Sequence, residues 1–193
     1  MPGLQRQIEE WAAADTTGAG AFLCAVAASH NDLLCGNILL VDEGKPEQAV
    51  TFIDFEYAAF FARGFDLGNH LCECSGYECD FEAMYPARDV RRRLLAAYAS
   101  AAGQDASDAF LDAMDVGVAL YAEASCLFWG MWAVVQASIS KIDFDFVNYG
   151  LLKFAGHYWL RERPPIAGAE AREPRTLKEV HDALGGAAPP AEA

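Results

Sequence analysis

Two stretches decide how this chain is interpreted: Ser29-His30-Asn31-Asp32-Leu33-Leu34-Cys35-Gly36-Asn37 and, farther along, Ile53-Asp54-Phe55-Glu56-Tyr57. The first places a carboxylate, Asp32, shortly before an amide, Asn37. The second places Asp54 and Glu56 directly after an apolar run. A positioned carboxylate can accept the proton of an attacking hydroxyl. Amide and carboxylate oxygens are the ligands that Mg²⁺ prefers. The residue types therefore indicate a general base next to a metal site.

The segment between these stretches predicts how the side chains come together. Residues 37–41 and 49–53 are short apolar runs, and residues 42–48 are rich in turn-forming side chains. Two such runs with a short polar connection are typical of an antiparallel hairpin. The first residue of one strand then lies beside the last residue of the other. We therefore expect Asn37 and Asp54 to meet at the open end of the hairpin, with Asp32 on the loop just before it.

Each fragment taken alone has a simpler explanation. His-x-Asp and Asp-x-Glu arise by chance in an acidic protein, and an Asp at a strand end is more often a turn or capping residue than a ligand. The order of the fragments, their spacing and the hairpin context together favour a functional site.

Composition limits the class of protein. A chain of 193 residues that is 53% hydrophobic and 12% aromatic suits one domain with a sizeable core. The net charge of −14 argues against binding to nucleic acid or to anionic membrane surfaces. The first residues lack the basic-then-apolar pattern of a signal peptide, so we expect a cytoplasmic protein.

Two further features have a functional and a structural interpretation. Residues 116–139 are apolar enough to span a bilayer, but Glu123 within them would be costly near the membrane centre. We expect a buried core helix and no stable membrane insertion. Cys72, Cys74 and Cys79 lack the paired spacing of zinc sites, so we expect free thiols that pack as small hydrophobic groups.

Hydrophobic periodicity predicts a helix-rich domain over residues 1–162. The expected helices are residues 5–14, 88–102, 108–138 (allowing for one break) and 147–161, with residues 58–73 entering another. Residues 21–28 look like a strand or buried segment, and residues 80–86 look irregular. The Pro-, Ala- and Gly-rich residues 163–193 are expected to form a mobile tail. Within this tail, Thr176-Leu177-Lys178-Glu179 has the capping-box form that starts a short helix.

Four stretches resemble the choline/ethanolamine kinases, which are relatives of the protein kinases. Besides residues 29–39 and 53–57, they are Phe65-Asp66-Leu67-Gly68-Asn69-His70 and Phe128-Trp129-Gly130-Met131-Trp132. In kinases of this kind, His-x-Asp-x-x-x-x-Asn precedes an Asp that holds magnesium. The resemblance covers roughly residues 5–160. It implies an α+β, helix-rich fold: a protein-kinase-like C-terminal lobe with a small β-hairpin.

The resemblance also implies an activity and a role for each residue. The activity is ATP-dependent phosphorylation of ethanolamine to phosphoethanolamine, which begins the CDP-ethanolamine route to phosphatidylethanolamine, with choline as the alternative substrate. Mg²⁺ is the implied cofactor and ATP the co-substrate. The catalytic residues would be Asp32, His30 and Asp66, with Asp32 as base and Asp66 supporting the loop. The metal ligands would be Asn37, Asp54 and Glu56. The amine would contact Glu73, Trp129, Trp132, Phe144 and Tyr149.

The amine pocket has a physical interpretation of its own. Trp129 and Trp132 are three residues apart, on one helix face. Aromatic faces within about 6 Å of a cation attract it, and a carboxylate such as Glu73 adds charge and accepts hydrogen bonds. Without the upstream motif, two such tryptophans would more simply be core residues. Residues 74–81 and 142–146 look closer to ethanolamine kinases than to choline kinases.

Full members of the family carry an N-terminal lobe that covers the phosphates, and its features are missing before Ala21. We therefore expect weak or no phosphoryl transfer from these residues, since that chemistry depends on positioning and charge stabilisation. A catalytically silent amine-binding module, or one that pairs with a complete kinase, is the alternative from another class. An aminoglycoside phosphotransferase shares the Asp-Asn-Asp pattern but does not account for the paired tryptophans.

Overall fold

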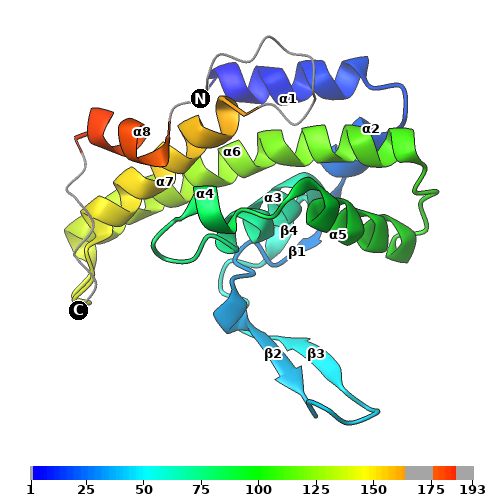
Figure 1. Ribbon diagram of the computed structural model, residues 1–193, viewed down its shortest axis with the longest axis horizontal. Coiled ribbons are helices and arrows are strands. Elements are labelled where there is room, and N and C mark those ends of the chain that lie inside the picture. The colour runs from blue at the N-terminus through cyan, green and yellow to red at the C-terminus, as the bar shows by residue number, and fades with distance from the viewer. Residues whose placement is uncertain (1, 164–175, 186–193) are drawn as a thin grey trace.

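The computed structural model describes residues 2–163 and 176–185, and it is organised around one long helix, α6 (Asp108–Ile139). Helix α6 runs the length of the molecule, and α1, α2, α3, α5 and α7 pack along it (Figure 1). In chain order the other helices are α1 (Pro2–Ala14), α2 (Ala19–Cys24), α3 (Arg63–Glu73), α4 (Phe81–Met84), α5 (Arg88–Ala101), α7 (Phe146–Arg161) and α8 (Leu177–Ala183). The predicted helix-rich α+β fold is confirmed.

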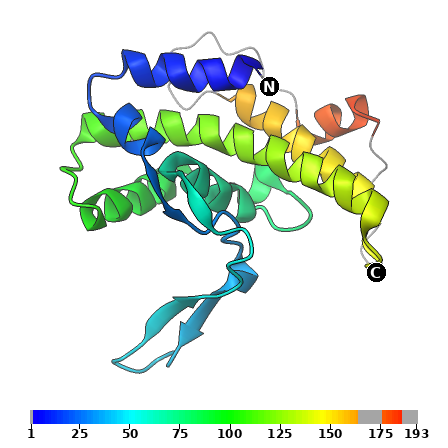
Figure 2. The ribbon, with the colours of Figure 1, turned by 180° about the vertical axis from the view of Figure 1, so that it is seen from behind.

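The predicted hairpin is confirmed. Strands β2 (Ile38–Val41) and β3 (Ala49–Phe52) pair antiparallel, with Ile38 opposite Phe52. One residue past this pair, the Ile53 amide donates to the Asn37 carbonyl at 3.1 Å. This hydrogen bond extends the pairing up to the predicted metal ligands Asn37 and Asp54. The hairpin projects from the helical body as an arm in both views (Figures 1 and 2).

A second small sheet was not predicted. Strand β1 (Val26–Ser29) pairs antiparallel with β4 (Ala59–Ala62), and Ser29 lies opposite Ala59. This pairing brings together the segment just before His30 and the segment that leads into α3. The segment expected to enter a helix does so in α3, but its first part forms a strand, because Ala59-Phe60-Phe61-Ala62 finds a partner strand distant in sequence.

Three other expectations need correction. The apolar run over residues 21–28 contains the end of α2 and most of strand β1. The sequence did not show this division, because periodicity cannot distinguish helix from strand in a short apolar run. Residues 80–86 contain the single-turn helix α4, which begins where the Asp80 carboxylate accepts from the Ala83 amide at 3.0 Å. Helix α6 continues without a break, and the Ser107 hydroxyl caps its start by accepting from the Phe110 amide.

Helix α6 is, within the described residues, the one helix whose length and composition would allow it to cross a membrane. Its buried side includes Met114, Val118, Ala122 and Cys126, each at most 1% exposed. Side chains on that side join two core clusters, one with α2, α3 and α5 and the other with α4 and α7. The apolar side chains on this side of α6 therefore pack inside the protein, as expected for a buried core helix.

Part of the predicted tail is described. Helix α8 begins with the expected capping box, in which the Thr176 hydroxyl and the Glu179 carboxylate satisfy each other's backbone amides. The helix packs on α7 with Val180 buried, and the Leu177 amide donates to Glu82 Oε1 at 2.9 Å. The short helix is confirmed. The rest of the predicted tail, residues 164–175 and 186–193, lies outside the described residues.

Candidate active site

Helix α3 fixes the loop that carries Asp32. The Asp66 carboxylate accepts hydrogen bonds from the backbone amides of His30 at 3.0 Å and Asn31 at 2.8 Å. Asn69, one turn later, donates from Nδ2 to the Asn31 carbonyl at 3.0 Å. Asn31 has a φ of 64°, in the left-handed region that Asn tolerates better than most residues. The loop is therefore held in an unusual conformation by two side chains of one helix.

His30 connects this loop to the end of the hairpin. Its Nε2 lies 2.8 Å from the Ile53 carbonyl oxygen, so Nε2–H can donate to that oxygen. Its ring lies against Phe55, with ring centroids 4.8 Å apart. Because Asp54 directly follows Ile53, this hydrogen bond sets where Asp54 lies relative to the loop. Asp54 itself has a φ of 62°.

The amide of Asn37 is oriented by Asp32. Asn37 Nδ2 donates to the Asp32 carbonyl at 2.9 Å and, more weakly, to Asp32 Oδ2 at 3.3 Å. Using the nitrogen in this way leaves Asn37 Oδ1 to serve as an acceptor or metal ligand. The arrangement brings the predicted base and the first predicted metal ligand into direct contact.

One cavity of about 710 Å³ gathers most of the predicted site. Nine of the predicted residues line it: Asp32, Asn37, Asp54, Glu56, Glu73, Trp129, Trp132, Phe144 and Tyr149. They come from the loop, the open end of the hairpin, α3, α6, the connection between α6 and α7, and α7. The other two predicted residues, His30 and Asp66, line a different cavity and reach this one only through the backbone that they hold.

Aromatic rings with fixed orientations form one wall of this cavity. The Trp129 and Trp132 centroids are 5.3 Å apart, and Tyr57 lies 5.0 Å from Trp129. Trp129 Nε1 donates to Asn69 Oδ1 at 2.7 Å, and Trp132 Nε1 donates to the Tyr57 hydroxyl at 2.9 Å. Both indole N–H groups are therefore satisfied within the protein, which leaves ring faces and edges as the contact surface.

The opposite aromatic group comes from α7 and the segment before it. Phe144 lies edge-on to Tyr149, with centroids 5.5 Å apart, and Tyr77 lies 6.4 Å from Phe144. Phe146 packs on Trp132 at 5.8 Å and joins the two groups. An aromatic-lined cavity of this kind suits a cation, because ring faces carry partial negative charge.

The cavity is strongly acidic. The carboxylates that line it are Asp32, Asp54, Glu56, Glu73 and Asp143, and none of its described lining residues is Lys or Arg. Burial, followed by the negative charge of Glu73, raises the pKa of Asp32 to about 6. A carboxyl with a pKa in this range is well suited to accept a proton near neutral pH.

The side chains at the hairpin end fit Mg²⁺ in chemical type. Asn37 offers an amide oxygen, and Asp54 and Glu56 offer carboxylates, all facing the same cavity. Over residues 2–163 and 176–185, no three His, Cys, Asp or Glu side chains are grouped to hold a metal by themselves. Mg²⁺ usually binds to one or two carboxylates and takes its remaining ligands from substrate phosphates and water.

Three contributors were missed at the sequence level. Tyr57 orients Trp132, Asn69 orients Trp129, and Lys153 forms an ion pair with Glu73. Tyr57 and Asn69 fall within the stretches that carry the resemblance, but only the packing of α3, and of the segment between β3 and β4, on α6 shows what they contact. Lys153 offered no signal, because a single lysine in an amphipathic helix is ordinarily a surface residue.

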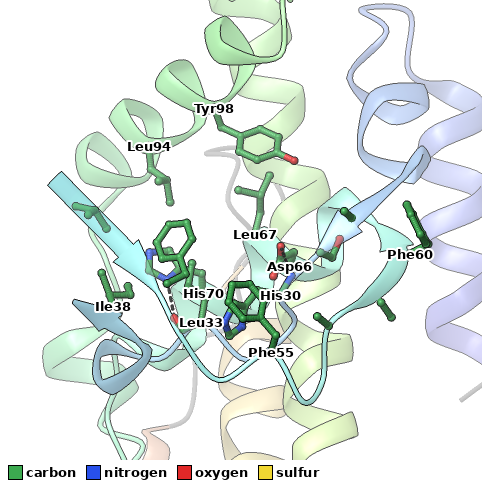
Figure 3. Close-up of a pocket in the computed structure, with 16 residues that line it drawn as sticks. His30, Leu33, Ile38, Phe55, Phe60, Asp66, Leu67, His70, Leu94 and Tyr98 are labelled. Atoms are coloured by element: carbon green, nitrogen blue, oxygen red, sulfur yellow. Dashed lines mark hydrogen bonds between the residues drawn. The ribbon is translucent and has the colours of Figure 1, made fainter. Parts of the chain in front are cut away.

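A second cavity, also of about 710 Å³, lies behind the catalytic loop and is mostly apolar (Figure 3). Its walls come from the hairpin, from the segment between β3 and α3, and from α3 and α5. His30 and Phe55 lie side by side in it, near Asp66 and Leu67, while Ile38, His70 and Leu94 lie together at another side (Figure 3). His70 Nδ1 contacts the Leu33 carbonyl at 2.9 Å, which fixes the loop from this side as well.

The arrangement of helices, small sheets and loop is that of small-molecule kinases of known structure. Plasmodium vivax ethanolamine kinase superposes with a TM-score of 0.62 at 24% identity, over 81% of this chain and 38% of that one. Choline kinase from Cryptosporidium parvum gives a TM-score of 0.60 at 21% identity, over 84% of this chain and 50% of that one. At this level of identity, the likeness establishes the fold.

The family model for choline/ethanolamine kinase matches residues 6–159, and this chain therefore belongs to that family. Among curated relatives, a probable ethanolamine kinase from Arabidopsis thaliana is 38% identical over 136 residues, 70% of this chain and 35% of that protein. Probable choline kinase 3 from the same plant is 34% identical, over 69% of this chain and 39% of that protein. Mouse ethanolamine kinase 1 is 33% identical, over 77% of this chain and 41% of that protein. The chain thus spans less than half the length of these relatives.

Proposed function

We propose that this chain carries the base, the metal ligands and the amine pocket of an ATP-dependent kinase that phosphorylates ethanolamine. The observation that carries the proposal is the single cavity in which Asp32, Asn37 and Asp54 face Glu73 and an aromatic wall. A base and two magnesium-type ligands beside a cation-binding pocket suit transfer of a phosphoryl group to an amino alcohol.

In the proposed reaction, the aromatic wall and Glu73 hold the ammonium group and direct the hydroxyl of ethanolamine towards Asp32. As the hydroxyl oxygen attacks the γ-phosphorus of ATP, the Asp32 carboxylate takes its proton. The bond from that phosphorus to the bridging oxygen breaks, and ADP leaves. Mg²⁺, when held by Asn37, Asp54 and Glu56, would neutralise charge on the phosphates. Asp66 and His30 act as positioning residues, because both contact the loop and strand end rather than this cavity.

Ethanolamine is the preferred substrate in this proposal, with choline as the alternative. A primary ammonium offers three N–H donors and needs acceptors, whereas a trimethylammonium offers none. Two carboxylates that line the cavity, Glu73 and Asp143, have no role in the proposed base or metal site and can accept from an ammonium. These acceptors support the primary amine, and the probable ethanolamine kinase from Arabidopsis thaliana named above points the same way.

A second candidate function is an amine-binding module without phosphoryl transfer. The aromatic wall and Glu73 favour it, because an ammonium group can bind to these side chains without a nucleotide.

The proposal is tested with the purified chain, its Asp32→Asn variant and a matched control, Asp89→Asn. The Asp89 carboxylate is exposed on α5, and it does not line the acidic cavity. Ethanolamine phosphorylation is followed by phosphate NMR, and amine and Mg-ATP binding by calorimetry. We expect Asp32→Asn to lower turnover at least about 100-fold while amine affinity and the control stay unchanged. Full turnover in Asp32→Asn would refute the assigned base. Amine binding with no nucleotide binding in the unmodified chain would favour the module.

A further inference from the structure

The acidic cavity has one buried cation behind its wall. Lys153 on α7 and Glu73 on α3 form an ion pair, with Nζ 2.9 Å from Oε1. The two side chains are only 1% and 9% exposed. An ion pair this deeply buried is costly to desolvate and adds little stability over a well-packed apolar pair. Its presence at this position therefore suggests a role other than holding the fold together.

Lys153 lies behind the cavity and does not line it. It follows Tyr149 by one helical turn, and its Nζ lies 5.3 Å from the centroid of the Tyr149 ring. Glu73 and Tyr149 both line the cavity, so the lysine contacts the inner side of two wall residues. Cys79 also lies near the ammonium, but burial raises the pKa of its thiol to about 12, so it stays neutral. Burial alone would lower the pKa of Lys153, yet the adjacent Glu73 carboxylate outweighs this and holds it above its usual range.

This contact gives the two oxygens of the Glu73 carboxylate different roles. Oε1 is occupied by Lys153, and Oε2 has no hydrogen-bond partner among the described residues. Lys153 offsets part of the negative charge of Glu73, and the charge that remains contributes to the raised pKa of Asp32. Glu73 also offers a lone pair of fixed direction on Oε2. A paired carboxylate of this kind attracts a cation through a directed hydrogen bond as well as through its charge.

We propose that Lys153 is a positioning residue for amine selection, which makes Glu73 an oriented hydrogen-bond acceptor and so favours a primary ammonium over a trimethylammonium. This inference rests on the proposed function and deepens it. An ethanolamine ammonium can donate to Oε2, whereas choline can use only the aromatic wall and the remaining carboxylates.

Removing the lysine is expected to weaken this preference. In Lys153→Met, Glu73 becomes a buried charge without its partner, which is unfavourable unless the carboxylate takes up a proton or turns away towards water. Either response removes the oriented acceptor from the cavity. Ethanolamine loses its hydrogen bond, while choline, which made none with Glu73, loses little.

The experiment measures ethanolamine and choline affinities of the full chain by calorimetry. The variants are Lys153→Met, the conservative Lys153→Arg and the double variant Lys153→Met/Glu73→Gln. The matched control is Arg91→Met, which breaks another buried ion pair: Arg91 Nε lies 2.7 Å from Asp115 Oδ1, with the Asp115 side chain 2% exposed. Neither Arg91 nor Asp115 lines the acidic cavity. General destabilisation lowers both amine affinities alike, so the ratio of the two affinities isolates the role in selection.

We expect Lys153→Met to weaken ethanolamine binding about tenfold and choline binding less than about threefold. The double variant should show the same loss of preference even if the single variant folds poorly, because it leaves no unpaired charge. Lys153→Arg should keep the ratio of ethanolamine to choline affinity of the unmodified chain, because arginine can also pair with Glu73. An unchanged ratio in Lys153→Met and in the double variant, or an equal shift in Arg91→Met, would overturn this inference and leave the proposed function intact. Failure of the unmodified chain to bind either amine would overturn both.

Discussion

The fold places Asp32 in a half-buried position among other carboxylates. It lies beside Glu73, Asp54 and Glu56 in one cavity, and has a pKa raised to about 6 by burial first and by these carboxylates next. The ionised form of a carboxyl in such a place has a higher free energy in the folded protein than in the unfolded chain. Residues that serve chemistry often reduce stability in this way.

This leads to a prediction about stability. Because the pKa of Asp32 rises from 3.8 to about 6 on folding, its ionised form costs stability at pH above 6, and the cost disappears as the pH falls towards 4. Asp32→Asn keeps an acceptor for Asn37 and removes the charge. We expect the variant to gain about 1 kcal/mol in the free energy of unfolding at pH 8, after allowance for the partial exposure of the site.

Calorimetric melting of both proteins at pH 8 and pH 4 checks this prediction. The difference in Tm should be positive at pH 8 and close to zero at pH 4. A variant that melts lower than the unmodified chain at pH 8 would show that Asp32 does not carry the expected cost.

At the scale of elements, local signals in the sequence were sufficient where the partner of a segment is near in sequence. The hairpin needed only two apolar runs and a turn between them, and its register Ile38↔Phe52 follows from that loop. The starts of α6 and α8 needed only capping residues, Ser107 and Thr176. Each of these features depends on contacts between residues close together in the chain.

Elements whose stability comes from distant partners were not visible in the sequence. Strand β4 pairs with β1, and Ala59-Phe60-Phe61-Ala62 has neither the alternation of a half-buried strand nor a nearby partner. Helix α2 has 6 residues and α4 has 4, lengths that packing must stabilise because isolated helices so short are not stable.

The close approach of α3 to α6 yields the prediction that belongs to this scale. A Cβ added at Gly68 would lie 2.6 Å from the Ala122 nitrogen and 2.8 Å from the Tyr121 carbonyl carbon, both backbone atoms of α6. The backbone of α6 cannot move aside as a flexible side chain could. Gly68→Ala should therefore push α3 and α6 apart and lower the free energy of unfolding by about 2 kcal/mol, despite the better helix propensity of Ala.

Urea denaturation measures this loss. Gly3→Ala is the control, since at Gly3 on α1 an added Cβ meets no described atom within 4 Å, and Ala there should stabilise by up to about 1 kcal/mol. Amine binding should weaken in Gly68→Ala, because Asn69 beside it orients Trp129. Equal stability of the two variants would mean that the α3–α6 contact is looser than the structure has it.

At the scale of the whole molecule, the candidate site is a product of packing between distant segments. Nine residues named from the sequence line one cavity: the spacing of loop and hairpin pointed to Asp32, Asn37 and Asp54, and the resemblance to the family implied the other six. Lys153 and the roles of Tyr57 and Asn69 were missed, because these depend on how α3, α6 and α7 meet. Motifs identify groups that do chemistry, whereas the groups that orient them become visible only in three dimensions.

The last prediction concerns the surface around the second, apolar cavity. Large apolar side chains there are exposed, among them Phe60 at 81%, Phe55 at 59% and Val50 at 56%. Both small sheets have only two strands, so their outer edges also have unpaired backbone groups. Exposed apolar surface next to open strand edges promotes association between protein molecules.

We therefore expect the purified chain to self-associate as its concentration rises, and Phe60→Lys to reduce this association. Sedimentation velocity over a concentration series measures the effect, and Met84→Lys, at a side chain that is 59% exposed on α4, is the matched control. Amine affinity should be the same in all three proteins, since neither Phe60 nor Met84 lines the acidic cavity. If the unmodified chain stays monomeric throughout the series, or if both variants reduce association equally, the surface around the second cavity does not drive association.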